Sequence, residues 1–145
     1  MKKIISLILI SVLLLCGAVY AEKPVTVKLN GEVLEFDAEP QLISERTMVP
    51  MRKIYESLGA SVEWIEEAQL IIATYKTSII SMEIGKESFN VTDVLSGDTE
   101  TITLDVPPQI VGTRTLVPVR AISEALEKNV EWDEETYTVL ITDLE

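Results

Sequence analysis

Two pairs of adjacent carboxylates, Glu66-Glu67 and Glu134-Glu135, are the first side chains in this sequence that could do chemistry. Glycosidases and aspartic proteases use such pairs as general acid and base. Here both pairs fall where we expect hairpin turns, so neighbouring side chains point apart and water screens them. Because a catalytic carboxyl usually needs burial to shift its pKa, we expect solvated turns and keep an acidic-pair hydrolase as an alternative.

Arg52 and Arg120 are the next candidates. Each stands near the start of an expected helix, four residues before a glutamate, Glu56 or Glu124. This spacing predicts an ion pair on the helix surface. The arginines could instead brace strand carbonyls or carboxylates, or they could contact a ligand, so we keep both as candidate ligand-contact residues.

Trp64 and Trp132 each lie in an expected strand, two residues after a valine and one residue after a glutamate. Strand alternation places the valine and the tryptophan on one face and the glutamate on the other, which is the pattern of core residues. An exposed indole could instead stack on a sugar ring. The two tryptophans therefore complete the list of candidate ligand-contact residues, and a cell-wall glycan-binding protein is an alternative function.

Histidine is absent from the sequence, which excludes several classes of catalytic site. A copper site built from three imidazole ligands cannot form, and neither can a Ser-His or Cys-His nucleophile pair. No glycine-rich phosphate loop, zinc-ligand spacing or EF-hand loop occurs in the sequence. We therefore expect no catalytic residue, no cofactor and no metal, and we predict that the chain is not an enzyme.

A long internal repeat organises the sequence. The stretch from Asp37 to Thr74 recurs without a gap from Asp105 to Thr142, at a constant offset of 68 residues and with 17 identities in 38 positions. Its sharpest part is Arg-Thr-Met-Val-Pro-Met-Arg at 46–52 against Arg-Thr-Leu-Val-Pro-Val-Arg at 114–120. Such self-similarity indicates one supersecondary unit that is used twice.

Each copy predicts the same elements: a short strand, a proline that opens a short helix, and a strand hairpin with an acidic turn. The strands are expected at 47–49, 62–65 and 70–75 in the first copy, and at 115–117, 130–133 and 137–142 in the second. Gly59 is expected to end the first helix in the left-handed conformation, and Asn129 to end the second.

The segments outside this match predict further strands. Asn30-Gly31 lies between alternating apolar runs and is a strong hairpin signal, and a second hairpin with a similar role is expected at 78–91. Residues 93–100 depart from the repeat, and we expect an inserted loop there that leads to an extra strand at 101–106.

Strands grouped around single helices with tight turns favour an α+β fold. We predict two repeated units of antiparallel β-sheet with one short helix each, the first at 22–76 and the second at 77–145. No linker rich in Gly, Ser or Pro separates the two units, so we expect them to pack as one body.

The first 21 residues read as a secretory signal peptide. Lys2 and Lys3 are followed by an apolar run that ends at Leu15, and small residues allow cleavage after Ala21. We therefore expect an exported protein, either secreted or held at the cell surface. Cys16 is the only cysteine, and Leu15 before it argues against lipoprotein anchoring, so the mature chain must be stable without a disulfide.

The charge balance limits the kind of partner. The formal net charge is −12, and loss of the two signal lysines would make it −14. A nucleic-acid binder needs clustered basic residues, and an anionic membrane surface would repel this chain. We therefore expect no nucleic-acid partner and no direct membrane binding after signal cleavage.

The repeated pattern resembles a known family. Asn-Gly, then Pro, then Arg-Thr-Leu-Val-Pro-x-Arg, then Glu-x-Leu, then Val-Glu-Trp is similar to the copper amine oxidase N-terminal-like domain, also called the stalk domain. The resemblance covers nearly all of residues 25–143, in two tandem copies. It implies an antiparallel sheet with a helix packed on it, and an exported bacterial protein. It implies no catalysis, because the stalk holds neither the copper ligands nor the quinone-forming tyrosine of the oxidase.

These observations predict an exported, non-catalytic binding or interaction module at the cell surface or in the medium. Its expected partner is an unidentified protein or glycan of the cell envelope, and it could form oligomers.

Overall fold

The structure, a computed structural model, describes residues 23–145. The expected signal peptide at 1–21, with Cys16, lies outside the described residues. Within 23–145 the fold is mostly β-strand, with two short α-helices and one 3₁₀ turn. No helix in this part of the chain is long and apolar enough to cross a membrane.

Three sheets contain all the strands of the described chain. Sheet A has the order β12-β13-β1-β2, sheet B the order β10-β11-β4-β3, and sheet C the order β5-β6-β7-β8-β9. The strand bounds are β1 Thr26–Leu29, β2 Glu32–Val33, β3 Gln41–Ile43, β4 Arg46–Pro50, β5 Ser61–Ile65, β6 Leu70–Tyr75, β7 Ser78–Glu83, β8 Ser88–Asp93, β9 Thr99–Thr103, β10 Gln109–Val111, β11 Arg114–Pro118, β12 Lys128–Asp133 and β13 Thr138–Asp143. The helices are α1 Met51–Ser57 and α2 Val119–Ala125, and the 3₁₀ turn is η1 Glu66–Ala68.

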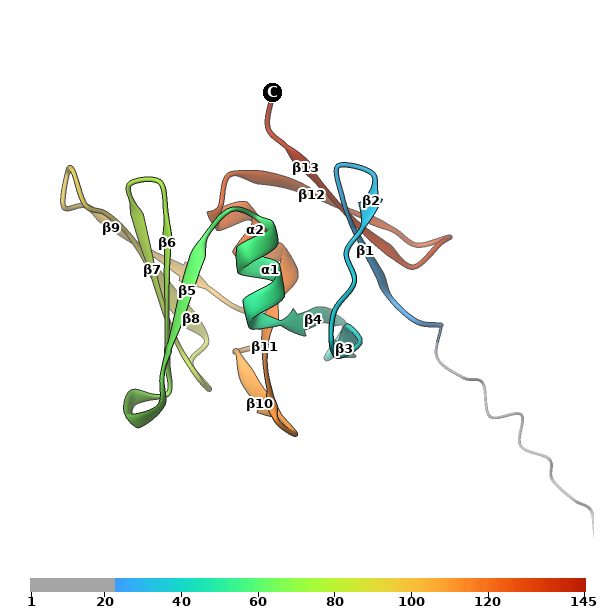
Figure 1. Ribbon diagram of the computed structural model, residues 1–145, viewed down its shortest axis with the longest axis horizontal. Helices are drawn as coiled ribbons and strands as arrows, with labels where there is room; N and C mark the ends of the chain where they lie inside the picture. The colour runs from blue at the N-terminus through green and yellow to red at the C-terminus, as the bar shows by residue number, and fades with distance from the viewer. Residues whose placement is uncertain (1–22) are drawn as a thin grey trace, which may run out of the picture.

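The two helices lie in the middle of the molecule, between sheet C on one side and sheet A on the other (Figure 1). Sheet B runs beneath them and connects the two sides. Helix α1 packs against β5 and α2 packs against β12. Each helix is therefore covered by the strand that follows it in the chain.

Every sheet combines strands from 22–76 with strands from 77–145. In sheet B the two strands of the Arg-Thr-x-Val-Pro-x-Arg motif, β4 and β11, pair antiparallel with Val49 opposite Val117. In sheet C the first half supplies β5 and β6, and the second half supplies β7, β8 and β9. Neither half of the described chain therefore forms a complete sheet by itself.

The expectation of purely antiparallel sheets is wrong at one place. β1 pairs in parallel with β13, from Thr26 opposite Thr138 to Leu29 opposite Ile141. A parallel neighbour cannot come through a tight turn and needs a long connection. Here the connection is almost the whole chain, so the N-terminal hairpin closes sheet A against the C-terminal hairpin.

A strand follows the expected loop, but it spans Thr99–Thr103 instead of 101–106 and is not the extra strand. β9 begins one residue before Glu100, and Glu100 matches Glu32 of β2 at the same offset of 68 residues. β2 and β9 both form the outer edge of a sheet. The additional strand is β7, which lies between β6 and β8, whereas β1 lies directly beside β13. The hairpin at 78–93 is therefore not equivalent to the Asn30-Gly31 hairpin.

The helix ends follow the expected pattern in one helix only. Pro50 and Pro118 precede the first helical residues and act as the N-cap positions without a side-chain cap. Gly59 has a φ of +89°, as expected for the left-handed residue after α1. After α2 the left-handed residue is Glu127, with a φ of +59°, and Asn129 lies in β12. The expectation for Asn129 is wrong because the repeat places residue 127 opposite Gly59.

One large core cluster takes residues from both helices and from sheets A and C. Tyr55 on α1 and Ser123 on α2 occupy the same position of the repeat, and both are fully buried. Neither hydroxyl has a hydrogen-bond partner in the described part of the chain. Burial also raises the pKa of the Tyr55 phenol above its usual range.

We predict that residues 22–76 and 77–145 do not fold when they are expressed separately, because each half would leave strands unpaired in all three sheets. Residues 22–145 should unfold in one cooperative transition. Urea unfolding followed by circular dichroism of the three chains tests this. Folding of either half with the stability of the whole would contradict it.

Tyr55→Phe should leave the free energy of unfolding at pH 7 unchanged or raise it by up to about 1 kcal/mol, because the deleted hydroxyl has no partner. The raised pKa in the folded state means that wild type loses stability as the pH rises above the unfolded tyrosine pKa of about 10. The free energy of unfolding of Tyr55→Phe should fall less than that of wild type between pH 7 and about pH 11. Urea unfolding at pH 7 and at about pH 11 measures this, and Tyr137→Phe, at a half-buried tyrosine, is the control.

Candidate functional site

The two candidate arginines hold the helices to the following strands. Arg52 Nη1 donates to the Val62 carbonyl oxygen at 3.3 Å, and Arg120 Nη1 donates to the Val130 carbonyl oxygen at 3.0 Å. The two arginine side chains remain a little more than half exposed. Each arginine therefore braces a strand and still presents charge to the solvent.

Both arginines also form the ion pair expected from their spacing. The closest nitrogen–oxygen distance is 3.6 Å between Arg52 and Glu56, and 3.4 Å between Arg120 and Glu124. Such exposed pairs contribute roughly 0.3–0.5 kcal/mol each. The hydrogen bonds to the strand carbonyls are therefore at least as important for the arginine positions.

The two tryptophans are half-buried, with part of each ring packed on the core. The Trp64 indole N–H donates to Glu66 Oε2 at 2.5 Å, and the Trp132 indole N–H donates to Glu134 Oε2 at 2.6 Å. The acidic turns therefore fix the edges of both indole rings. Each tryptophan packs against the core and also lines a groove. The Trp132 ring additionally makes an edge-to-face contact with Tyr137, with 5.3 Å between the ring centroids.

Two ion pairs cross between the halves of the chain in a reciprocal way. Arg46 donates from Nε and Nη2 to Asp105 Oδ2, at 3.0 and 2.6 Å. Arg114 Nη2 lies 2.9 Å from Asp37 Oδ2. Because Asp37 and Asp105, like Arg46 and Arg114, are equivalent positions of the repeat, each half supplies the arginine for the aspartate of the other.

These residues meet in two equivalent grooves. The first groove, of about 520 Å³, is lined by Trp64, Arg52, Arg114 and Asp37 together with other residues. The second groove, of about 350 Å³, is lined by the equivalent residues Trp132, Arg120, Arg46 and Asp105. Both grooves thus share one indole, two guanidinium groups and one aspartate. Further carboxylates line each of them, Glu35 and Glu56 in the first and Glu45 and Glu131 in the second.

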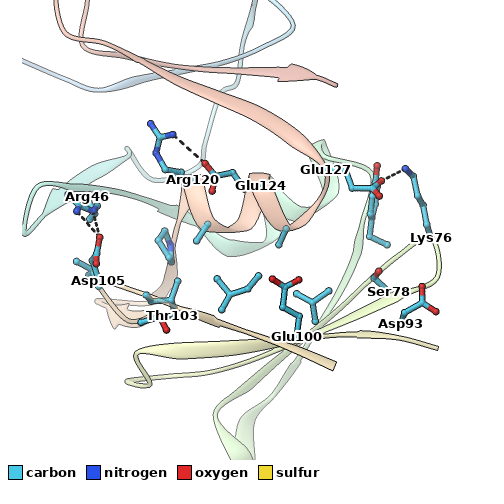
Figure 2. A pocket seen from close by; sticks show the side chains of 18 of the residues that line it. Arg46, Lys76, Ser78, Asp93, Glu100, Thr103, Asp105, Arg120, Glu124 and Glu127 are labelled. Atoms are coloured by element: carbon cyan, nitrogen blue, oxygen red, sulfur yellow. Dashed lines mark hydrogen bonds and ion pairs between the residues drawn. The ribbon is translucent and has the colours of Figure 1, made fainter. Parts of the chain in front are cut away.

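A larger pocket of about 680 Å³ lies between α2 and sheet C. Figure 2 shows it beneath the helix, with the Arg46–Asp105 and Lys76–Glu127 ion pairs at opposite ends. A hydrogen bond from Lys76 to Glu127 raises the pKa of the lysine. Backbone N–H groups of Ser96 and Leu95 lower the pKa of Asp93 at the same end.

The acidic pairs behave as the sequence predicts. Glu66, Glu67, Glu134 and Glu135 are all exposed, and one member of each pair accepts the indole hydrogen bond described above. Among residues 23–145 no group of three or more carboxylates or other ligating side chains could hold a metal ion. Nothing in this geometry favours the hydrolase alternative.

The four residues proposed from the sequence account for part of each groove. They separate into Arg52 with Trp64 and Arg120 with Trp132, one pair in each groove. The crossed Arg–Asp pairs that also line the grooves were not predicted from the sequence. The repeat contains the signal for them, since Asp37 and Arg46 recur at 105 and 114, but only the β4–β11 pairing shows that the partners are exchanged.

Comparison with known proteins assigns the family. The model of the copper amine oxidase N-terminal domain matches residues 28–141. The chain therefore belongs to the copper amine oxidase N-terminal domain family, as the repeated motif indicated. The match runs across both halves as one stretch, and it does not confirm two tandem copies.

A curated relative is named "Protease inhibitor" and comes from Brevibacillus choshinensis. It is 25% identical over 118 residues, which cover 81% of this chain and 34% of the relative. The chain thus spans about a third of the length of the curated relative that it matches.

Proposed function

We propose that this chain is an exported, non-catalytic binding module that contacts a cell-envelope partner through its two equivalent grooves. The observation that carries the proposal is the recurrence of the same tryptophan, two arginines and aspartate in both grooves. Residues needed only for packing would not have to leave indole and guanidinium surface open to solvent. The absence of histidine from the sequence also supports a non-catalytic role.

The partner class that fits the grooves best is a cell-wall glycan. A sugar ring can stack on a partly exposed indole, while the groove arginines donate hydrogen bonds to its hydroxyl groups and the groove carboxylates accept them. Two equivalent sites on one rigid body would bind a long polymer with higher avidity than either groove alone. The acidic chain, with a net charge of −12, supports neither a nucleic-acid partner nor direct membrane binding.

We predict that residues 22–145 sediment with purified insoluble peptidoglycan and that Trp64→Ala and Trp132→Ala each weaken this binding. Each single variant loses the avidity of two sites, and the double variant should lose most of the binding because neither groove keeps its indole. Each substitution should also lower the free energy of unfolding, by less than the roughly 3–5 kcal/mol expected for a fully buried tryptophan. The measurements are co-sedimentation and urea unfolding of the same proteins.

Leu42→Ala is the matched control, because it removes a 40% exposed apolar side chain that lines neither groove. It should leave binding unchanged. Wild-type binding by both folded single tryptophan variants would exclude the grooves as the glycan site.

Inhibition of an extracellular protease is a second candidate function, favoured by the turn at 94–97. Leu95 is 82% exposed at its tip. Asp93 holds the turn, because its Oδ1 accepts the backbone N–H groups of Leu95 and Ser96 at 2.8 and 3.0 Å, and its Oδ2 accepts the Thr77 hydroxyl at 2.9 Å. A pre-organised apolar side chain on a rigid turn loses little entropy on binding. The name of the curated relative supports the same candidate.

If this candidate is correct, residues 22–145 inhibit a protease that prefers leucine, such as subtilisin, and Leu95→Asp abolishes the inhibition. Val33→Asp, at a 55% exposed valine on the opposite sheet, should not affect it. Hydrolysis of a chromogenic peptide measures the effect. Equal inhibition by both variants, or cleavage of the chain without inhibition, would reject this function.

A further inference from the structure

The pocket beneath α2 is wide because sheet C has one strand more than sheet A. β9 is separated from β6 by β7 and β8, whereas its counterpart β2 is separated from β13 by β1 alone. One additional strand moves the sheet edge outward by about 4.8 Å. The helix adds to the space, because Ala121 and Ala125 stand where α1 has Lys53 and Ser57.

The strand at this edge has backbone groups free for pairing. Backbone hydrogen bonds from Asp93 N–H to the Asp98 carbonyl oxygen and from Leu104 N–H to the Glu87 carbonyl oxygen lie at the two ends of the β8–β9 ladder. Because hydrogen-bonded positions alternate in an antiparallel ladder, Glu100 and Ile102 bond to β8. The N–H and C=O groups of Thr99, Thr101 and Thr103 therefore face away from the sheet.

Successive side chains of β9 point alternately to the two faces of sheet C. The Thr99 hydroxyl lies 2.9 Å from that of Thr92, and the Thr101 hydroxyl donates to Asn90 Oδ1 at 2.8 Å. Glu100 and Ile102 line the pocket on the other face, and Figure 2 shows Glu100 extending from β9 toward α2. The free backbone edge and the pocket are thus two sides of one strand.

Glu100 is the uncompensated charge of this pocket. The three cations that line the pocket are each paired with a carboxylate: Arg46 with Asp105, Arg120 with Glu124 and Lys76 with Glu127. Asp93 accepts hydrogen bonds within its own turn. Within residues 23–145 the exposed Glu100 carboxylate forms neither an ion pair nor a hydrogen bond, and Val91, which pairs with it across the ladder, and Ile102 line the same pocket.

We propose that an extended segment of a partner protein adds to the free edge of β9 and places a lysine or arginine side chain in this pocket against Glu100. Backbone hydrogen bonds to Thr99, Thr101 and Thr103 would supply sequence-independent affinity. The basic group would pair with Glu100, and its aliphatic stem would cover the apolar pocket wall. Since alternate side chains share a face, an apolar residue two positions away would meet Ile102.

The size and charge of the site agree with this occupant. A pocket of about 680 Å³ lies within the roughly 300–1,000 Å³ typical of ligand sites. An acidic chain with a net charge of −12 attracts a basic segment. The site goes beyond the proposed glycan function. It shares Arg46, Asp105 and Arg120 with the second groove but includes neither tryptophan, and Glu100 and the free edge of β9 line no groove. Variants of Glu100 and of the tryptophans therefore test the two sites separately.

The test uses ¹⁵N-labelled residues 22–145 and the peptide acetyl-Thr-Val-Thr-Lys-Thr-Val-Thr-amide, with a twin that carries glutamate in place of lysine. We expect the lysine peptide to shift the amide resonances of Thr99, Thr101 and Thr103 with saturation, and the glutamate twin to bind more weakly. Absence of saturable shifts along β9 with the lysine peptide, or equal affinity for both peptides, would overturn the proposal.

Two variants separate the charge from the backbone contribution. Glu100→Gln should weaken the lysine peptide about threefold to tenfold and remove the difference between the twins, whereas Glu67→Gln in the exposed η1 turn should have no effect. Thr101→Pro removes one outward N–H, which an edge strand tolerates, and should also weaken binding. Protection of the Glu100 and Ile102 amides from hydrogen exchange verifies that this variant keeps the β8–β9 pairing.

The outcomes distinguish this site from the grooves. Loss of peptide binding in Glu100→Gln with unchanged peptidoglycan binding supports a separate protein-binding edge. Peptide shifts confined to the indole resonances of Trp64 and Trp132 would place the peptide in the grooves and reject the β9 site.

Discussion

The antiparallel pairing of β4 with β11 is the contact on which the rest of the structure depends. Proline has no N–H, so Pro50 and Pro118 can occupy only the non-hydrogen-bonded positions of this ladder. Val49 and Val117 must then be the pair that exchanges backbone hydrogen bonds, and both are fully buried. The prolines fix the register and also end the strands, since a helix begins immediately after each of them. One short ladder therefore sets the positions of both helices.

The crossed ion pairs and the two grooves follow from this ladder. Two equivalent strands that pair antiparallel are related by a local two-fold axis. A contact from a residue of the first half to the second half therefore recurs, between the equivalent residues, from the second half to the first. Arg46 and Arg114 stand at the starts of the two strands and consequently reach Asp105 and Asp37 of the opposite halves. These pairs are exposed and add little stability. Their effect is to hold a guanidinium group beside the tryptophan of each groove.

The sequence could predict elements that depend on local chemistry and could not predict how the halves combine. The Asn30-Gly31 turn and the left-handed Gly59 follow from backbone preferences of single residues, and both occur as expected. The parallel β1–β13 pair joins segments more than a hundred residues apart, and no local pattern encodes such a pairing. β9 is the counterpart of β2, because Glu100 and Ile102 continue the repeat opposite Glu32 and Leu34. The additional strand is β7, which lies outside the repeat, so no match in the sequence marks it.

The candidate site also has a part that the sequence could predict and a part that it could not. Tryptophan and arginine were recognisable because their types and their recurrence in the repeat are visible in the chain. The pocket beneath α2 depends instead on a departure from symmetry. Where the halves are equivalent, the structure presents the same groove twice; where β7 enters sheet C, one edge moves outward and exposes Glu100 beside apolar surface. A symmetric body can bind a repeating polymer at two places, whereas an asymmetric edge can recognise a single segment. The inserted strand therefore gives this small domain a second kind of surface without changing the ladder that holds it together.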